Sequence, residues 1–279
     1  MNKIGQKKVV IWVLISIIVI YSIGQLFPLI WLVDFSFCTS NDLFGSFILK
    51  LPSPPQFINY VDAWTIGKYP KFLLNSVLIN TLTVSVTVFL SIIMGYAFTR
   101  MEWKLRNTCF TIVLLGMMIP IHATLLPNFL LFGKLKLLDT LPGILIPYIA
   151  FSMPLGIFIM AAFLRTIPKA LEESAIIDGC GIFRLIFQII TPLTKPAIVT
   201  VSVMTFINSW NEFIMALTYL NTDKFKTIPF SIMSFMGLYG GNYAAQFAIM
   251  TLAALPSLLV YALLNEQITK GVTVGGIKG

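Results

Sequence analysis

The sequence predicts an all-α integral membrane protein with six transmembrane helices, and three observations support this prediction. The chain of 279 residues is 57% hydrophobic, and only 11% of its residues are charged. Its mean hydropathy is +0.89. Because a soluble domain has about 25% charged residues, this chain has too little polar surface for water. The few charges also leave apolar runs of about 20 residues or more, which is the length of one membrane-spanning helix.

The predicted spans are the longest charge-poor runs of the chain, namely 9–33, 72–99, 107–133, 140–164, 196–222 and 243–265. The fifth run contains a single acid, Glu212. The sixth run is the end of a longer uncharged stretch, 227–265, in which several glycines are expected to end one helix before the next begins. The third, fourth and sixth runs contain prolines, which remove helical hydrogen bonds and predict kinked spans. These prolines are Pro120, Pro127, Pro147, Pro154 and Pro256.

The placement of lysine and arginine predicts the orientation of the chain. With a cytoplasmic N-terminus, 12 of the 19 basic residues lie on the cytoplasmic side and 7 lie outside, as the positive-inside rule requires. Both termini are therefore expected inside. The net charge of +8 indicates this topology and contact with anionic membrane lipid, not nucleic acid. No histidine, cysteine or acid cluster has the spacing of a metal site or a catalytic site.

This topology divides the chain into three predicted parts. Residues 1–71 contain the first transmembrane helix and the first extracytoplasmic loop, 72–265 form the core transmembrane domain, and 266–279 form a cytoplasmic tail. The core includes a charged cytoplasmic segment, 165–195, that predicts two short helices. Thr166 is expected to cap the first helix, and Gly179 to end it in a left-handed conformation. The second is expected over 182–190.

The motifs of this segment resemble the cytoplasmic signature loop of bacterial ABC importer permeases. The resemblance rests on Glu173-Ser174-Ala175, the following Gly179, and Ile190-Thr191-Pro192. Ser174 stands where the family usually has alanine, and Thr191 where it usually has leucine. Further motifs are similar to the carbohydrate-uptake branch, and in particular to the smaller permease subunit of maltose-type importers. They are Ile167-Pro168-Lys169, Ile177-Asp178-Gly179, Pro192-Leu193, Lys195-Pro196-Ala197, Phe206-Ile207-Asn208-Ser209-Trp210-Asn211-Glu212 and the glycine-rich tail from Lys270.

This resemblance implies a type I ABC importer permease fold in a multi-pass protein of the bacterial cell membrane. It also implies a second permease subunit, two copies of a cytoplasmic ATPase, an extracytoplasmic sugar-binding protein and a sugar substrate. The residues expected to couple this chain to the ATPase are Glu173, Ser174, Ala175, Asp178, Gly179 and Pro192. The residues of the tail expected to reach the ATPase are Gly275, Gly276, Lys278 and Gly279. Among the acids, Glu173→Lys is expected to abolish coupling, and Glu172→Lys to do much less harm.

The chain is not expected to be an enzyme. It contains no Gly-x-x-x-x-Gly-Lys-Ser/Thr phosphate loop, so ATP hydrolysis is expected on the separate ATPase subunit. That subunit would bind ATP and Mg²⁺, and this chain would bind no cofactor. An alternative function is a secondary, ion-coupled transporter. Such a protein needs intramembrane acids or broken-helix ion sites. A single acid, Glu212, is weak evidence for an ion-coupled transporter.

Glu212 and its neighbours are the candidates for a sugar path. An acid within a span is costly unless it faces protein or water, so Glu212 is a candidate functional residue. Amides and carboxylates bind sugar hydroxyls, and aromatic rings pack on sugar rings, which extends the candidates to Asn208, Trp210 and Asn211. The alternative is that Glu212 is a polar clamp between helices or part of the lining of an outer gate. The sequence leaves both readings open.

Overall fold

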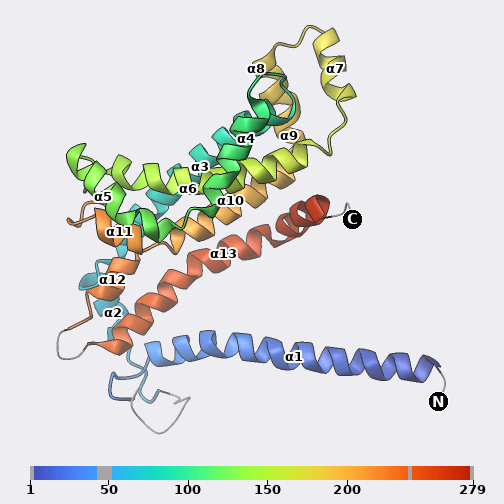
Figure 1. Ribbon diagram of the computed structural model, residues 1–279. Helices are drawn as coiled ribbons and strands as arrows, with labels where there is room; N and C mark the ends of the chain where they lie inside the picture. The colour runs from blue at the N-terminus through green and yellow to red at the C-terminus, as the bar shows by residue number, and fades with distance from the viewer. Residues whose placement is uncertain (1–2, 43–51, 238–240, 277–279) are drawn as a thin grey trace. The chain divides into compact units, whose positions relative to one another are not determined.

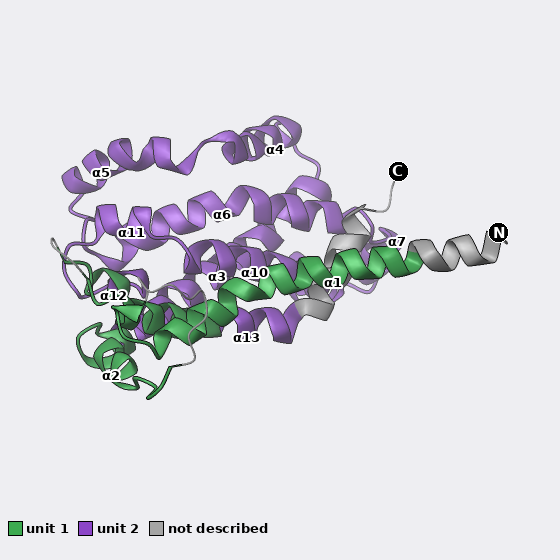
Figure 2. Ribbon diagram, turned by 90° about the horizontal axis from the view of Figure 1, so that it is seen from below, with its two compact units in different colours: residues 1–70, 231–255 green, residues 71–230, 256–279 purple. Residues whose placement is uncertain are grey.

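The computed structural model describes residues 3–42, 52–237 and 241–276, and every regular element in these ranges is a helix (Figure 1). The helices are α1 (Lys3–Ser36), α2 (Ile58–Thr65), α3 (Tyr69–Thr99), α4 (Arg106–Leu115), η2 (Gly116–Met118), η3 (Ile121–Thr124), α5 (Leu125–Lys134), α6 (Leu141–Leu164), α7 (Ala170–Ile177), α8 (Ile182–Arg184), η4 (Leu185–Ile190), α9 (Thr191–Leu193), α10 (Lys195–Trp210), α11 (Ile214–Tyr219), α12 (Pro229–Met233) and α13 (Tyr243–Gly276). The chain forms two compact units, Met1–Pro70 with Ser231–Leu255 and Lys71–Phe230 with Pro256–Gly279 (Figure 2).

In the first unit, buried polar contacts tie the end of α1 to α2. The Asn59 amide donates to the carbonyl oxygens of Ser36 and Cys38, each at 2.9 Å. The Ser36 hydroxyl also forms a hydrogen bond of 2.7 Å with the Tyr60 hydroxyl. By contrast, residues 11–30 of α1 are exposed along their whole length. An apolar surface of this size is typical of a helix that faces lipid or another membrane protein.

The second unit is organised around α3, α6 and α10. A row of small polar side chains lies buried on one face of α3, at the spacing of successive helical turns: Ser76, Asn80, Thr83, Thr87 and Ser91. A Cβ atom at Gly156 of α6 would overlap the Ser91 hydroxyl, so the two helices approach closely there. The Ser209 hydroxyl of α10 donates to Asn80 Oδ1 at 2.6 Å. Small residues and interhelical hydrogen bonds of this kind are how membrane helices associate.

The predicted spans hold with three corrections. Within the described residues, four helices are long and apolar enough to cross a membrane, and six spans result if two bent helix pairs each count as one. The third predicted span is such a pair, because Arg106–Met118 and Ile121–Lys134 meet at 96° where Pro120 interrupts the helix. The fifth does not run to residue 222, since α10 ends at Trp210 and α11 starts at Ile214. The sixth begins at Tyr243 as predicted but continues past residue 265 to Gly276.

Candidate functional site

The segment 165–195, predicted to be cytoplasmic, contains the two predicted short helices. The first is α7, which lies at one end of the second unit, with α5 and α11 at the other (Figure 1). Gly179 ends it with φ +78°, as predicted. The amide of Gly179 donates to Ile176 O and that of Cys180 to Ala175 O, both at 3.0 Å, which is the Schellman arrangement. The predicted cap is wrong, because the Thr166 hydroxyl donates backwards to Phe163 O at 2.8 Å.

One acid of α7 points into the protein. Glu172 is 7% exposed, and its Oε1 lies 2.8 Å from Arg100 Nε in a buried ion pair. Its Oε2 accepts a hydrogen bond of 3.0 Å from the Tyr96 hydroxyl on α3. Charges are rarely buried unless they are paired and hydrogen-bonded, and Glu172 meets both conditions. The structure therefore contradicts the reason for expecting a mild effect at Glu172.

Arg100 connects three elements at this end of the unit. The residue follows directly after α3 and pairs with Glu172 of α7. Its Nη2 donates at 2.7 Å to the carbonyl oxygen of Leu164, the last residue of α6, and at 2.6 Å to that of Ile167 in the turn that follows. This position is favourable for a cation, because the last carbonyl groups of a helix carry a partial negative charge. A single side chain thus joins α3, α6 and α7.

The outward face of α7 is unusually apolar. Ile177 is 84% exposed and Ile176 is 59% exposed, and Leu171 also faces out. The predicted coupling residues Glu173, Ser174, Asp178, Gly179 and Pro192 are exposed, whereas Ala175 is buried. A short helix that buries an acid and exposes its isoleucines has the reverse of the usual amphipathic pattern. Its outer surface has the composition of an interaction site.

Glu212 lies at the break between α10 and α11, and its carboxylate is held by the protein. Oε2 accepts from the Tyr148 hydroxyl at 2.7 Å. The backbone amides of Met215 and Ala216 donate to Oε1 at 2.7 Å and to Oε2 at 3.2 Å. These amides are at the start of α11, where unpaired donors need an acceptor. Of the two interpretations left open, these contacts favour the polar clamp.

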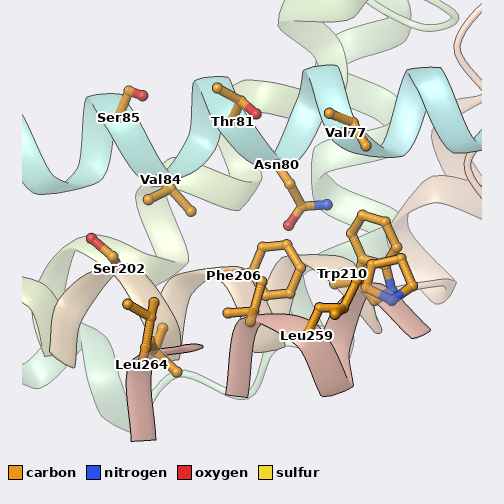
Figure 3. Close-up of a pocket in the computed structure, with 13 residues that line it drawn as sticks. Val77, Asn80, Thr81, Val84, Ser85, Ser202, Phe206, Trp210, Leu259 and Leu264 are labelled. Carbon is orange, nitrogen blue, oxygen red and sulfur yellow. The ribbon is translucent and has the colours of Figure 1, made fainter. Parts of the chain in front are cut away.

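The other candidates near Glu212 point in different directions. Asn208 and Asn211 are exposed, and Asn208 lines a small polar pocket against α6. Trp210 is buried beside a cavity of about 470 Å³ between α3, α10 and α13. Figure 3 shows Trp210 and Phe206 on one side of this cavity and Asn80 on the other. The structure therefore does not gather the four residues at one binding surface.

Sequence comparison identifies the family of the chain. The sequence profile of binding-protein-dependent transport system inner membrane components matches residues 87–274. The chain belongs to this family. It is 36% identical over 252 residues to a putative ABC transporter permease protein of Caldicellulosiruptor sp. (strain Rt8B.4), covering 90% of this chain and 91% of the relative. It is 32% identical to an arabinooligosaccharides transport system permease protein of Bacillus subtilis (strain 168), covering 92% of each.

A solved structure supports the fold of the permease. The permease resembles one chain of a bacterial ABC transporter involved in the import of the acidic polysaccharide alginate, with a TM-score of 0.82. The match is 20% identical in sequence and covers 96% of this permease and 99% of that chain. It confirms the predicted fold class, an all-α membrane protein of the type I importer permease fold. The family confirms the predicted membrane location and the dependence on a binding protein.

The tail residues of the permease are only partly described. Gly275 and Gly276 belong to the last turn of α13, so the helix continues into the predicted tail, 266–279. Lys278 and Gly279 lie outside the described residues. Across the described part of the chain, no group of three or more histidines, cysteines and acids could hold a metal ion.

Proposed function

We propose that this permease is one of two permease subunits of an ATP-driven sugar or oligosaccharide importer. The relatives named for arabinooligosaccharide transport support a carbohydrate substrate, and the signature loop supports a separate ATPase. Two copies of that ATPase bind ATP and Mg²⁺ and carry out hydrolysis, while an extracytoplasmic binding protein delivers the sugar. The permease itself is not an enzyme and binds no cofactor.

The outward face of α7 carries this proposal, because it is the surface on which the ATPase would dock. Ile176 and Ile177 offer apolar area in the centre of the contact, and Glu173 offers a charge beside it. Interfaces of this kind use a buried apolar centre and a few oriented polar groups. Ser174, Asp178, Gly179 and Pro192 border the same surface, and Ala175 packs behind it.

The proposal also assigns an orientation. With α7 facing the ATPase, both termini lie in the cytoplasm, 1–71 supplies the first span and outer loop, and 72–265 forms the core. The end of the chain, 266–279, then lies on the ATPase side, where Gly275 to Gly279 would contact the ATPase. For the sugar path, Asn208 and Asn211 are the exposed candidates of the original four. Trp210 is buried and the Glu212 carboxylate accepts three internal hydrogen bonds.

The ion-coupled alternative has little support in this structure. A transported ion needs oxygen ligands that are free to bind it, and the only acid within the predicted spans is Glu212. The Tyr148 hydroxyl and two backbone amides occupy its oxygens. Glu212 is therefore better explained as a structural residue than as an ion ligand.

Glu173→Lys tests the proposed function. A charged residue at a docking interface costs about 3–5 kcal/mol when its partner is lost, whereas an exposed ion pair contributes about 0–1 kcal/mol. Glu173→Lys should therefore insert and assemble with the second permease but lose import of an arabinooligosaccharide or malto-oligosaccharide mixture. A basic-to-acidic change on the ATPase should restore part of the import. Glu102→Lys is the matched control, since Glu102 is an exposed acid in the loop after α3 and should import normally. Wild-type import by Glu173→Lys, with the ATPase bound, would overturn the proposal.

A further inference from the structure

We propose that Tyr96, Arg100 and Glu172 form a latch that fixes α7 to the ends of α3 and α6, so that the docking helix moves together with these two spans. Arg100 and Glu172 are then positioning residues, since they act by holding the outward face of α7 in place. The inference rests on the proposed function, because it concerns how movement at the ATPase surface reaches the membrane.

The first argument is how little else holds α7. Of its eight residues, only Glu172 and Ala175 are buried. Ala175 is small and packs against a cluster that includes Ile167 and Leu185, but its methyl group offers little contact area. The larger apolar residues of the helix face outward. The hydrophobic effect, which places most helices, therefore contributes little here, and the Glu172 contacts are the principal attachment.

The second argument is the geometry of the attachment. Each oxygen of Glu172 has its own partner, with Arg100 Nε at 2.8 Å and the Tyr96 hydroxyl at 3.0 Å. The same arginine donates through Nη2 to the carbonyl group of Leu164, the last residue of α6, and to that of Ile167 in the turn that follows. The planar guanidinium group presents its donors in a fixed arrangement. Rotation of α7 relative to α3 or α6 would break several of these contacts together.

The third argument is that the two adjacent acids of α7 face different surfaces. Successive residues of an α-helix point about 100° apart, so Glu172 and Glu173 cannot both face the same surface. Glu172 is buried and paired inside the permease, while Glu173 is exposed on the docking side. A displacement of Glu173 is thereby transferred through the adjacent residue, Glu172, to the Arg100 contacts. This arrangement suits transmission of a displacement better than a flexible loop would.

The test is a distance measurement between spin labels in the intact importer, purified without nucleotide or sugar. Cys38, Cys109 and Cys180 are replaced by serine, and labels are attached at Leu171→Cys on α7 and Leu74→Cys on α3, both exposed positions. Leu171 is used because Ile176 and Ile177 belong to the proposed docking surface. A second pair, Leu74→Cys with Phe158→Cys on α6, reports only on the spans. The latch predicts one narrow distance peak for both pairs in the otherwise unchanged protein.

Glu172→Gln and Arg100→Lys remove different parts of the latch. Glu172→Gln removes the charge while keeping the shape, and Arg100→Lys keeps the charge but loses the planar group that reaches Leu164 and Ile167. In each variant the α7 pair should lose its single narrow peak, while the span pair keeps it. A merely structural role would broaden the distance distributions of both pairs or leave both narrow, and either of these results overturns the latch. If Arg100→Lys cannot be purified, the near-isosteric Glu172→Gln alone decides between the same outcomes.

Glu173→Gln separates failure of the latch from failure of the proposed function. Glu173 has the same charge and lies one residue further along α7, but on the exposed side, so its α7 pair should stay narrow. The amount of ATPase retained on each purified complex is measured in the same samples. Narrow peaks for Glu172→Gln would reject the latch, whatever the ATPase does. Full ATPase retention and import by Glu173→Lys would reject the docking role, whatever the distances are.

Discussion

Two partly or fully buried carboxylates lie near opposite ends of the second unit, and they are held in related but different ways. Each accepts a hydrogen bond from a tyrosine hydroxyl on a span, Glu172 from Tyr96 at 3.0 Å and Glu212 from Tyr148 at 2.7 Å. Beyond this shared contact, Glu172 is paired with the cation of Arg100. Glu212 instead accepts backbone amides at the start of α11.

The difference separates two uses of a buried acid. The amides that meet Glu212 come from residues three and four positions further along the chain, so this carboxylate fixes a local turn. Arg100 directly follows a different helix, α3, and lies 72 positions before Glu172 in the sequence, so that carboxylate joins distant elements. Local capping stabilises one helix start, whereas a buried ion pair fixes which elements lie together, and its loss leaves an uncompensated charge.

The largest effect should come from Arg100→Ala. It leaves the Glu172 carboxylate buried without its cation, which typically costs about 3–5 kcal/mol. The apparent thermal midpoint of the detergent-purified complex should fall clearly. Because the cost is that of an unpaired charge, adding Glu172→Ala to Arg100→Ala should recover part of the loss, and the double-mutant cycle measures the coupling. Additive losses from the two substitutions would contradict a specific pair.

The two tyrosines provide a matched pair with the next largest effect. Tyr148→Phe removes a hydrogen bond to Glu212, and hydrogen bonds to charged groups contribute about 1.5–3 kcal/mol. Tyr96→Phe removes the corresponding bond to Glu172, whose charge Arg100 still compensates. We therefore expect Tyr148→Phe to lower the apparent thermal midpoint more than Tyr96→Phe. A larger fall for Tyr96→Phe would show that the backbone amides of α11 compensate the charge of Glu212 at least as well as Arg100 compensates that of Glu172.

These two acids also show what could be predicted from the sequence. The spans, the signature loop and the left-handed Gly179 follow from charge spacing, motif and helix-end chemistry, all of which are local. The clamp role of Glu212 was open, although an acid just before a new helix start is a recognisable cap signal. Glu172 was misjudged because its partner Arg100 is distant in sequence. No local pattern distinguishes Glu172 from Glu173, because the isoleucines that follow them, Ile176 and Ile177, are exposed in the structure.

The sequence also could not show where predicted spans are interrupted. Pro120 breaks the third run into helices that meet at 96°, whereas α6 contains Pro147 and Pro154 and continues through both. A proline removes the same hydrogen bond in every case, and neighbouring helices decide whether the helix bends or only loses a bond. Those neighbours are a tertiary property.

A smaller effect is expected at the turn that ends α7. Gly179 has φ +78°, a conformation in which an L-residue is disfavoured by about 1–2 kcal/mol. Gly179→Ala should therefore reduce the stimulation of ATP hydrolysis by the binding protein, with an apparent thermal midpoint only slightly lowered. Gly181→Ala is the control, because a Cβ meets nothing within 4 Å at either glycine and the φ of Gly181 is −72°. Equal effects of the two substitutions would exclude backbone strain as the cause.

The smallest effect concerns a third carboxylate, Asp139, which lies in the exposed loop before α6. Its Oδ1 accepts from the backbone amides of Asn221 and Thr222, both at 3.0 Å. It thus resembles Glu212 in being held by amides, but it is more open to water. Burial acts to raise the pKa of Asp139, but the hydrogen bonds from Thr222 and Asn221, helped by the charge of Lys226, outweigh burial and lower it.

Because the folded pKa is lowered, the stabilisation by Asp139 is fully present above the ordinary aspartate pKa of about 3.9. It is lost as the pH falls through the folded pKa, since protonation removes the charge that the amides favour. Asp139→Asn keeps an oxygen for both amides and tolerates the positive φ of 61° at this position, but it cannot titrate. The apparent thermal midpoint of the unchanged permease should therefore fall more steeply than that of Asp139→Asn between about pH 5 and pH 3. Parallel pH profiles would show that the amide contacts to Asp139 contribute nothing measurable, and that a carboxylate held by amides stabilises this protein only where, as at Glu212, water is more fully excluded.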